Sequence, residues 1–204
     1  MRTALHRIAA GALAYVVSYL LVGLATVTRI DNLLTLDSAT TIDPIVVYQS
    51  AGNPVWQAIG WFTLNAHGVP VTIANETGNV VAAMNFVHHQ GAWLGVIQGS
   101  LGLLPMLACL LVGLGVTLRS CQSPVPLSVG AYMTLGYLLA VFASTVVFSG
   151  TVGPIDASFA LPMNIRSTRW FIFVLLTPLV FGSVGAFLGR SPVFESAFER
   201  LAPE

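Results

Sequence analysis

The sequence predicts an all-α integral membrane protein: a single membrane domain, residues 1–204, built as a four-transmembrane-helix bundle. Three observations predict this fold class. Hydrophobic residues make up 55% of the chain, charged residues only 8%, and four long stretches carry no charge. A soluble domain usually has about a quarter charged residues. Because so few charges cannot cover a water-facing surface, we expect part of the surface to face the lipid bilayer.

The four transmembrane helices are expected at about residues 8–28, 93–118, 127–149 and 170–189. A transmembrane helix needs about 20 mainly apolar residues. The second charge-free stretch, residues 77–118, is long enough for two helices, but its first part holds residues that are costly in hydrocarbon: Asn85, His88, His89 and Gln90. We therefore interpret residues 79–91 as a helical entry at the membrane interface.

The first charge-free stretch, residues 8–28, has two interpretations, a retained anchor or a cleaved signal peptide. The apolar region of a signal peptide spans about 7–15 residues and is followed by a small-residue cleavage site. This stretch is longer and lacks a clean site. We favour the retained anchor.

Arginine placement predicts the orientation. Arg2, Arg7, Arg119, Arg190 and Arg200 would lie on one side of the membrane, and Arg29, Arg166 and Arg169 on the other. The positive-inside rule places the richer side in the cytoplasm. We expect a multi-pass protein of the cell membrane with both termini cytoplasmic, and a cytoplasmic C-terminal tail at residues 190–204.

The outer segment, residues 30–91, contains a predicted short helix. Asn53 suits the N-cap and Pro54 the first helical position. At about twelve residues this helix is too short to span a bilayer. Residues 69–73 look extended. Tryptophan rings favour membrane–water interfaces, so we predict interfacial positions for four residues: Trp56, Trp61, Trp93 and Trp170.

Two sets of small residues predict close helix packing. Glycines four residues apart line one helical face and let another backbone approach. The first set is Gly91, Gly95 and Gly99, with Gln98 beside it, and the second is Gly182, Gly185, Ala186 and Gly189. These faces could form a homo-oligomer or pack within the bundle. We favour packing within the bundle, because four spans must pack on each other in any case.

Candidates for site chemistry are few. His67, His88 and His89 are weak candidates for metal ligands, because their spacing matches no common metal motif. We expect them to be bonded to backbone or headgroups. Asn75 begins an N-glycosylation triplet, Asn-Glu-Thr, in the outer segment. No Asp, Glu, Arg, Lys or His lies in a predicted span, and no nucleophile or phosphate-loop motif occurs. We expect no cofactor and no enzymatic activity.

A net charge of zero without a basic patch argues against a nucleic-acid partner. The expected partners are the lipid bilayer and either a protein partner or further copies of the chain.

One motif carries a family resemblance. The outer segment contains Trp56, Gly60, Trp61, Asn65, Ala66 and His67 in the pattern W-x-x-x-G-W-x-x-x-N-A-H. With the Gly-Ala-x-Ala-Tyr run near the N-terminus, this resembles a family of small haloarchaeal multi-pass membrane proteins of unknown function. The resemblance implies an archaeal cell membrane and supplies no activity. The neutral charge departs from the acidic surfaces usual in that group.

The resemblance draws attention to Asn65 and His67. On a helix that starts at Pro54, Asn65 could cap the C-terminus and His67 could pair with the last carbonyls. We favour this structural role over ligand binding.

Three classes of function remain open from the sequence. The first is a non-enzymatic scaffold or accessory subunit of a membrane complex, which we favour. The second is an oligomeric channel or transporter for a small solute. The third is a redox or metal-binding membrane subunit that uses its histidines.

Overall fold

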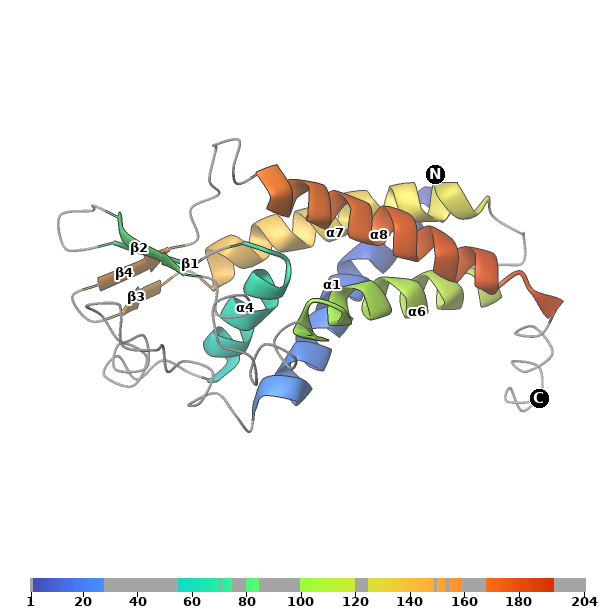
Figure 1. Ribbon diagram of the computed structural model, residues 1–204. Coiled ribbons are helices and arrows are strands. Elements are labelled where there is room, and N and C mark those ends of the chain that lie inside the picture. The colour runs from blue at the N-terminus through green and yellow to red at the C-terminus, as the bar shows by residue number, and fades with distance from the viewer. Residues whose placement is uncertain are drawn as a thin grey trace. The chain divides into compact units, whose positions relative to one another are not determined.

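Five helices and four strands form the secondary structure of the residues that the structure describes. The structure is a computed structural model (Figure 1). It describes residues 2–27, 55–69, 71–74, 80–84, 100–119, 125–148, 150–152, 155–158 and 168–192. The helices are α1 (Arg2–Thr26), α4 (Val55–Ala66), α6 (Leu104–Leu118), α7 (Pro126–Val147) and α8 (Thr168–Leu188). The strands are β1 (Val71–Ala74), β2 (Val80–Met84), β3 (Gly150–Val152) and β4 (Ile155–Ser158).

The chain divides into two units. The helical unit comprises Met1–Ser18, Pro105–Val141 and Phe171–Glu204. The mixed unit comprises Tyr19–Leu104 and Phe142–Trp170. Helices α1 and α7 each contribute their first part to the helical unit and their last turns to the mixed unit.

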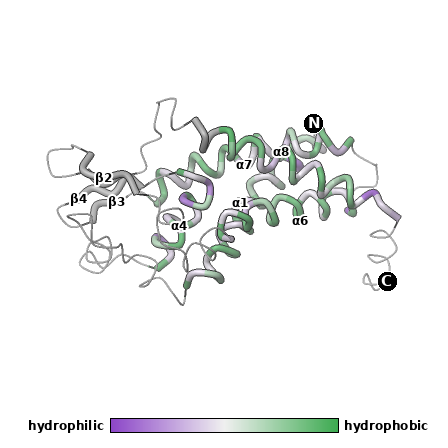
Figure 2. The backbone as a smooth tube through the Cα atoms, viewed as in Figure 1, coloured by the Kyte–Doolittle hydropathy of each residue, from purple (hydrophilic) through white to green (hydrophobic). Residues whose placement is uncertain are grey.

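Among the residues that the structure describes, two helices are long and apolar enough to cross a membrane. They are Thr3–Thr26 of α1 and Pro126–Val147 of α7. Helix α6 and the Ile172–Leu188 part of α8 are apolar but shorter. Hydrophobic colour predominates along α6, α7 and α8 in Figure 2. The first seven residues of the span expected at 93–118 lie outside the described residues. Two of the four expected spans therefore overlap helices that could cross a membrane by length and composition.

Glycines bring the helices of the helical unit into backbone contact. A Cβ atom on Gly11 of α1 would overlap the Met133 carbonyl of α7, and one on Gly136 of α7 would overlap the Ile8 carbonyl of α1. Such close approach supplies the van der Waals contact through which small residues hold helices together. Helices α1 and α7 therefore pack through reciprocal glycines.

Helix α8 packs in the same way on two neighbours. A Cβ on Gly185 would overlap the Leu110 carbonyl of α6, and one on Gly113 of α6 would overlap the Gly182 carbonyl of α8. On its other side, α8 lies against Gly130 of α7, where a Cβ would overlap Ser183. The contacts give the neighbour order α1–α7–α8–α6 around the helical unit.

The outward faces of these helices are apolar. Large exposed hydrophobic residues include Leu13, Val16, Leu20 and Leu24 on α1, Leu107 and Leu111 on α6, Leu135, Leu139 and Val146 on α7, and Ile172, Leu176, Val180 and Val184 on α8. Several helical threonines donate their hydroxyl to a carbonyl three or four residues earlier, as Thr26 does to Val22 at 2.7 Å. Such bonds satisfy hydroxyls that hydrocarbon cannot.

A four-stranded antiparallel sheet lies in the mixed unit, with the strand order β2-β1-β4-β3. β1 pairs with β2 (Val71 opposite Met84) and with β4 (Ile73 opposite Ala157), so the segment after α4 pairs with the segment after α7. The pairing of β1 with β2 shifts register between Ile73 and Ala74.

The sheet corrects the expected all-α fold, and it agrees with one segment that was expected to be extended. Strand β2 occupies Val80–Met84, where we expected a helical entry. The run Val71–Ile73, expected to be extended, lies in β1. Two β-branched valines begin β2, and its backbone groups find partners on β1, so tertiary pairing overrides the helical interpretation.

Candidate functional site

The last carbonyl at the end of α7 is held by two side chains of α4. Phe148 follows α7, and its carbonyl accepts a 2.9 Å hydrogen bond from Trp61 Nε1 and a 3.3 Å bond from Gln57 Nε2. Carbonyls at a helix C-terminus have no partner within the helix. All three residues are buried. Residues 57 and 61 are one helical turn apart, so α4 presents both donors on one face.

Aromatic rings surround the Phe148 side chain. The ring of Tyr19 on α1 stacks on it, with centroids 5.6 Å apart and planes 6° apart, and the Trp56 ring lies 5.9 Å away. A Cβ on Gly60 would overlap the Phe148 ring, so glycine provides the surface on which the ring rests. The Tyr19 hydroxyl donates a 2.9 Å bond to the Trp56 carbonyl. We call Gln57, Trp61, Trp56, Tyr19 and Phe148 the Phe148 clamp.

Helix α4 ends in a Schellman motif. Val69 N donates to the Leu64 carbonyl at 3.0 Å, and Gly68 N donates to the Asn65 carbonyl at 2.8 Å. Gly68 has φ 77°, the left-handed conformation that favours glycine at this position. Leu64 and Val69, the residues whose apolar contact accompanies this motif, are both fully buried. The motif reverses the chain from α4 towards β1.

Asn65 and His67 reinforce this turn. Asn65 Nδ2 donates to the Val69 carbonyl at 2.9 Å, and His67 Nδ1 lies 2.5 Å from the Thr63 carbonyl. Since a carbonyl can only accept, Nδ1 carries the proton in the neutral ring. Asn65 and His67 are both fully buried. The structure thus places both residues at the C-terminus of α4, where these bonds go to backbone carbonyls of the same turn.

Burial determines the charge state of His67. Desolvation lowers the pKa of the imidazole to about 4, although the bond to the Thr63 carbonyl raises it in part. The ring is therefore neutral at physiological pH. Within the part of the chain described, no cluster of three or more His, Cys, Asp or Glu side chains could hold a metal ion.

The mixed unit should lose stability as the pH falls from about 6.5 to 4. In the unfolded chain His67 has its ordinary pKa of 6.5, so it binds a proton below that pH. In the folded protein it stays neutral until the pH reaches about 4. The loss should approach roughly 3 kcal/mol. Hydrogen exchange of the α4 amides against pH measures it. His67→Asn, which keeps a donor near Nδ1, should flatten the profile, and His6→Asn on the exposed face of α1 should leave it unchanged. An equally steep profile in His67→Asn would contradict the assignment.

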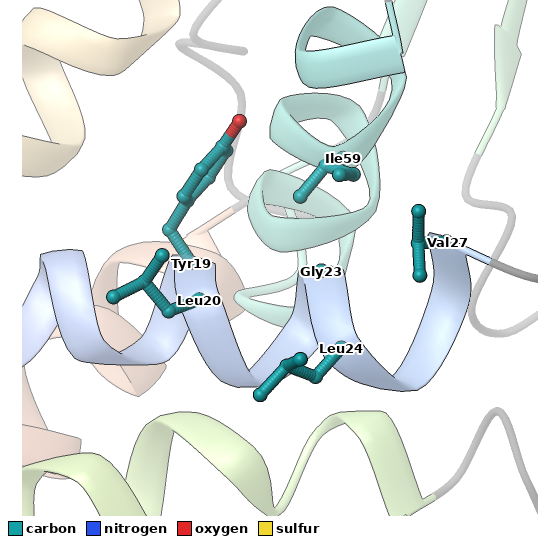
Figure 3. Close-up of a pocket in the computed structure, with 6 residues that line it drawn as sticks. All are labelled: Tyr19, Leu20, Gly23, Leu24, Val27 and Ile59. Atoms are coloured by element: carbon teal, nitrogen blue, oxygen red, sulfur yellow. The ribbon is translucent and has the colours of Figure 1, made fainter.

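An apolar groove lies beside the Phe148 clamp. Its lining consists of Tyr19, Leu20, Gly23, Leu24 and Val27 of α1 and Ile59 of α4, and its volume is about 240 Å³ (Figure 3). In Figure 3, α4 rises steeply from α1 near Gly23, and Ile59 projects from α4 towards α1. The one polar group in the lining, the Tyr19 hydroxyl, is already bonded to the Trp56 carbonyl.

A family model matches residues 1–191, a region that contains all five described helices, the Phe148 clamp and the groove. The chain belongs to DUF7978, a family of unknown function. No curated protein and no solved structure matches it. Membership in a family of unknown function is thus shown. The resemblance to a haloarchaeal family and its W-x-x-x-G-W-x-x-x-N-A-H motif stay predictions.

Several predicted site residues of this DUF7978 member lie outside the described residues. They are Asn75, His88, His89, Gly91, Trp93, Gly95, Gln98 and Gly99. Trp170 lies in the first turn of α8, where only the backbone is described. Glycosylation at Asn75 and interfacial positions for Trp93 and Trp170 therefore stay predictions.

The second small-residue face of this DUF7978 chain lies inside the helical unit. Gly185 and Gly189 face α6, Gly182 lies between α6 and α7, and Ala186 is fully buried. These residues are therefore in contact with helices of the same chain.

Trp61 was expected at the membrane–water interface. Only 3% of its surface is exposed and its N–H is bonded to a protein carbonyl, and its position relative to a membrane stays a prediction. The interfacial rule rests on a ring that needs one wet end, and here the Phe148 carbonyl replaces water. Trp56 is 47% exposed, which leaves its interfacial position as a prediction.

Sequence reasoning missed three parts of the site in this DUF7978 member: Tyr19, Phe148 and Gly68. Gly68 had a readable signal, because a glycine directly after an apolar helical run is typical of a helix C-terminus. Tyr19 and Phe148 had none, since each lies at the end of an apolar stretch and meets α4 only in the folded chain.

Proposed function

We propose that this protein is a non-enzymatic integral membrane protein that serves as a scaffold or accessory subunit of a membrane complex. It would span the bilayer four times, with α6 and α8 extended by the neighbouring residues, and with both termini in the cytoplasm. The observation that carries the proposal is that apolar outward helix faces occur together with buried polar side chains that are hydrogen-bonded within the chain at the Phe148 clamp and the turn after α4. The apolar faces suit contact with lipid or with helices of a partner, and the hydrogen-bonded polar groups suit a rigid platform.

The basic residues of the helical unit support the orientation. Arg7 Nη1 donates to Ser128 Oγ in the first turn of α7 at 3.0 Å. Arg119 and Arg190 follow the ends of α6 and α8, which meet where a Cβ on Gly189 would contact Thr117. Since α7 runs antiparallel to α8, these arginines lie at one end of the helical unit. Such an end suits the cytoplasmic side.

The packing of α1 supports a retained anchor. Gly11 of α1 lies against the Met133 backbone of α7, and Gly136 of α7 lies against Ile8 of α1. The rings of Tyr15 and Tyr137 meet edge to face, 5.7 Å apart. Cleavage after α1 as a signal peptide would remove one side of this packing.

The outer part of the mixed unit is the proposed docking platform for a protein partner. Its α4 is fixed to the ends of α1 and α7 by the Phe148 clamp, so the platform would present a fixed shape. Rigid surfaces lose little entropy on binding. His67 supports the non-enzymatic proposal because it is fully buried and contacts the Thr63 carbonyl.

Purification from native membranes in a mild detergent tests the scaffold. We expect a stoichiometric protein partner to co-elute with the tagged full-length chain and to remain after repeated gel filtration. An unrelated tagged membrane protein of similar size, purified in parallel, is the control for non-specific capture. Repeated recovery of the chain alone as a monomer would contradict the scaffold. Flux into vesicles that contain the purified chain, above that of empty vesicles, would favour a channel instead.

A further inference from the structure

The groove on α1 continues the apolar stripe of that helix. Leu13, Val16, Leu20 and Leu24 recur at helical spacing and are between 49% and 76% exposed. Leu20 and Leu24 also line the groove. Since α1 is one of the two helices able to cross a membrane, a spanning α1 would place the groove beside acyl chains.

We infer that this groove is a binding site for one acyl chain of a membrane lipid. The inference rests on the membrane insertion proposed above. The lining is chemically compatible with an acyl chain, because it is made of aliphatic side chains and one aromatic ring. The Tyr19 hydroxyl is occupied by the Trp56 carbonyl, so the groove offers an incoming ligand no unsatisfied hydrogen-bonding group.

The geometry favours a flexible chain over a helix as the occupant. A partner helix would have to lie along the α1 stripe, because it is about 10 Å wide and straight over several turns. At Gly23 it would meet α4, which crosses there and directs Ile59 into the angle between the two helices (Figure 3). A single acyl chain is narrow and can bend past this crossing.

Gly23 sets the depth of the groove. It is a buried position on α1, and a Cβ there would lie 3.3 Å from Cγ2 of Ile59. A larger side chain at this position would fill the angle between α1 and α4. An unfilled hollow of about 240 Å³ beside lipid would leave its lining without van der Waals partners. Neighbouring lipid therefore fills the groove rather than leaving it empty.

Photocrosslinking tests the site on the full-length chain. The protein is reconstituted into phosphatidylcholine vesicles that contain phosphatidylcholine with a diazirine on one acyl chain, illuminated, and digested for mass spectrometry. We expect lipid adducts on the α4 peptide that carries Ile59, although α4 is too short to span. Gly23→Phe should lower the yield of these adducts by about fivefold, because its ring displaces the chain. Leu13→Phe, on the same stripe away from the groove, should leave the yield unchanged.

Two further measurements distinguish the absence of the lipid site from a folding defect of the variant and from a failure of the proposed membrane insertion. Gly23→Ala fills less space and should lower the yield by about twofold, so it replaces Gly23→Phe if circular dichroism shows that the larger variant is unfolded. An equal yield in a folded Gly23 variant and in Leu13→Phe would overturn the site. Removal of the wild-type protein from the vesicles by alkaline carbonate would instead overturn the proposed membrane insertion.

Discussion

Replacing Gly113 by alanine should destabilise the helical unit by about 2–3 kcal/mol. A Cβ at this position of α6 would overlap the carbonyl oxygen of Gly182 on α8, which is backbone and cannot rotate away. The two helices would have to separate, and separation would also loosen the contact of Gly185 with the Leu110 carbonyl. Unfolding of the purified protein by SDS titration in mixed micelles, followed by circular dichroism, measures the change.

Gly115 provides a matched control on the same helix. It lies two residues further along α6, and a Cβ there would meet nothing within 4 Å. Gly115→Ala should therefore be neutral or should stabilise α6 by up to about 1 kcal/mol, because alanine has the higher helix propensity. Equal effects at Gly113 and Gly115 would show that α6 and α8 do not pack through these glycines.

Replacing Phe148 by alanine should release α4 from the ends of α1 and α7. The ring is 8% exposed and fills the space bounded by Tyr19, Trp56 and Gly60. Removing a buried phenylalanine side chain costs about 3 kcal/mol or more. The carbonyl that Trp61 and Gln57 bind would remain, so the loss reports on the ring alone.

Hydrogen exchange of the α4 amides measures the release. A loss of about 3 kcal/mol corresponds to a roughly hundredfold faster exchange. Phe142→Ala removes the same side chain from α7 at a position that is 38% exposed, and should change α4 exchange little. Unchanged α4 protection in Phe148→Ala would mean that the clamp does not hold the helix.

The sequence was informative where the signal was local. Helices α1, α7 and α8 coincide with three charge-free stretches, because the absence of charge over about 20 residues is readable without knowledge of the fold. The C-terminal turn of α4 was also accessible, since Asn65 and His67 follow a helical run at capping distance. Both inferences depend only on residues close together in the chain.

The sheet and the Phe148 clamp could not be predicted from residues close together in the chain. Strands β3 and β4 are three and four residues long and are rich in residues of low strand propensity, such as Gly150 and Ala157. β4 is defined by its pairing with β1, more than 80 residues earlier, and β3 by its pairing with β4. The bond from Trp61 to the Phe148 carbonyl joins positions 87 residues apart. Sequence spacing carries no signal for such contacts.

The pairing of β1 with β4 also constrains biogenesis. Strand β1 leaves the ribosome long before residues 148–158, which supply both the acceptor for Trp61 and the neighbouring strand. Until that segment has been synthesised, the edge of β1 that pairs with β4 and the Trp61 side chain lack these partners. Completion of this part of the molecule is therefore a late event, and contacts of such long sequence separation form slowly. A nascent chain arrested before Phe148 would display that unfinished surface to quality-control proteases.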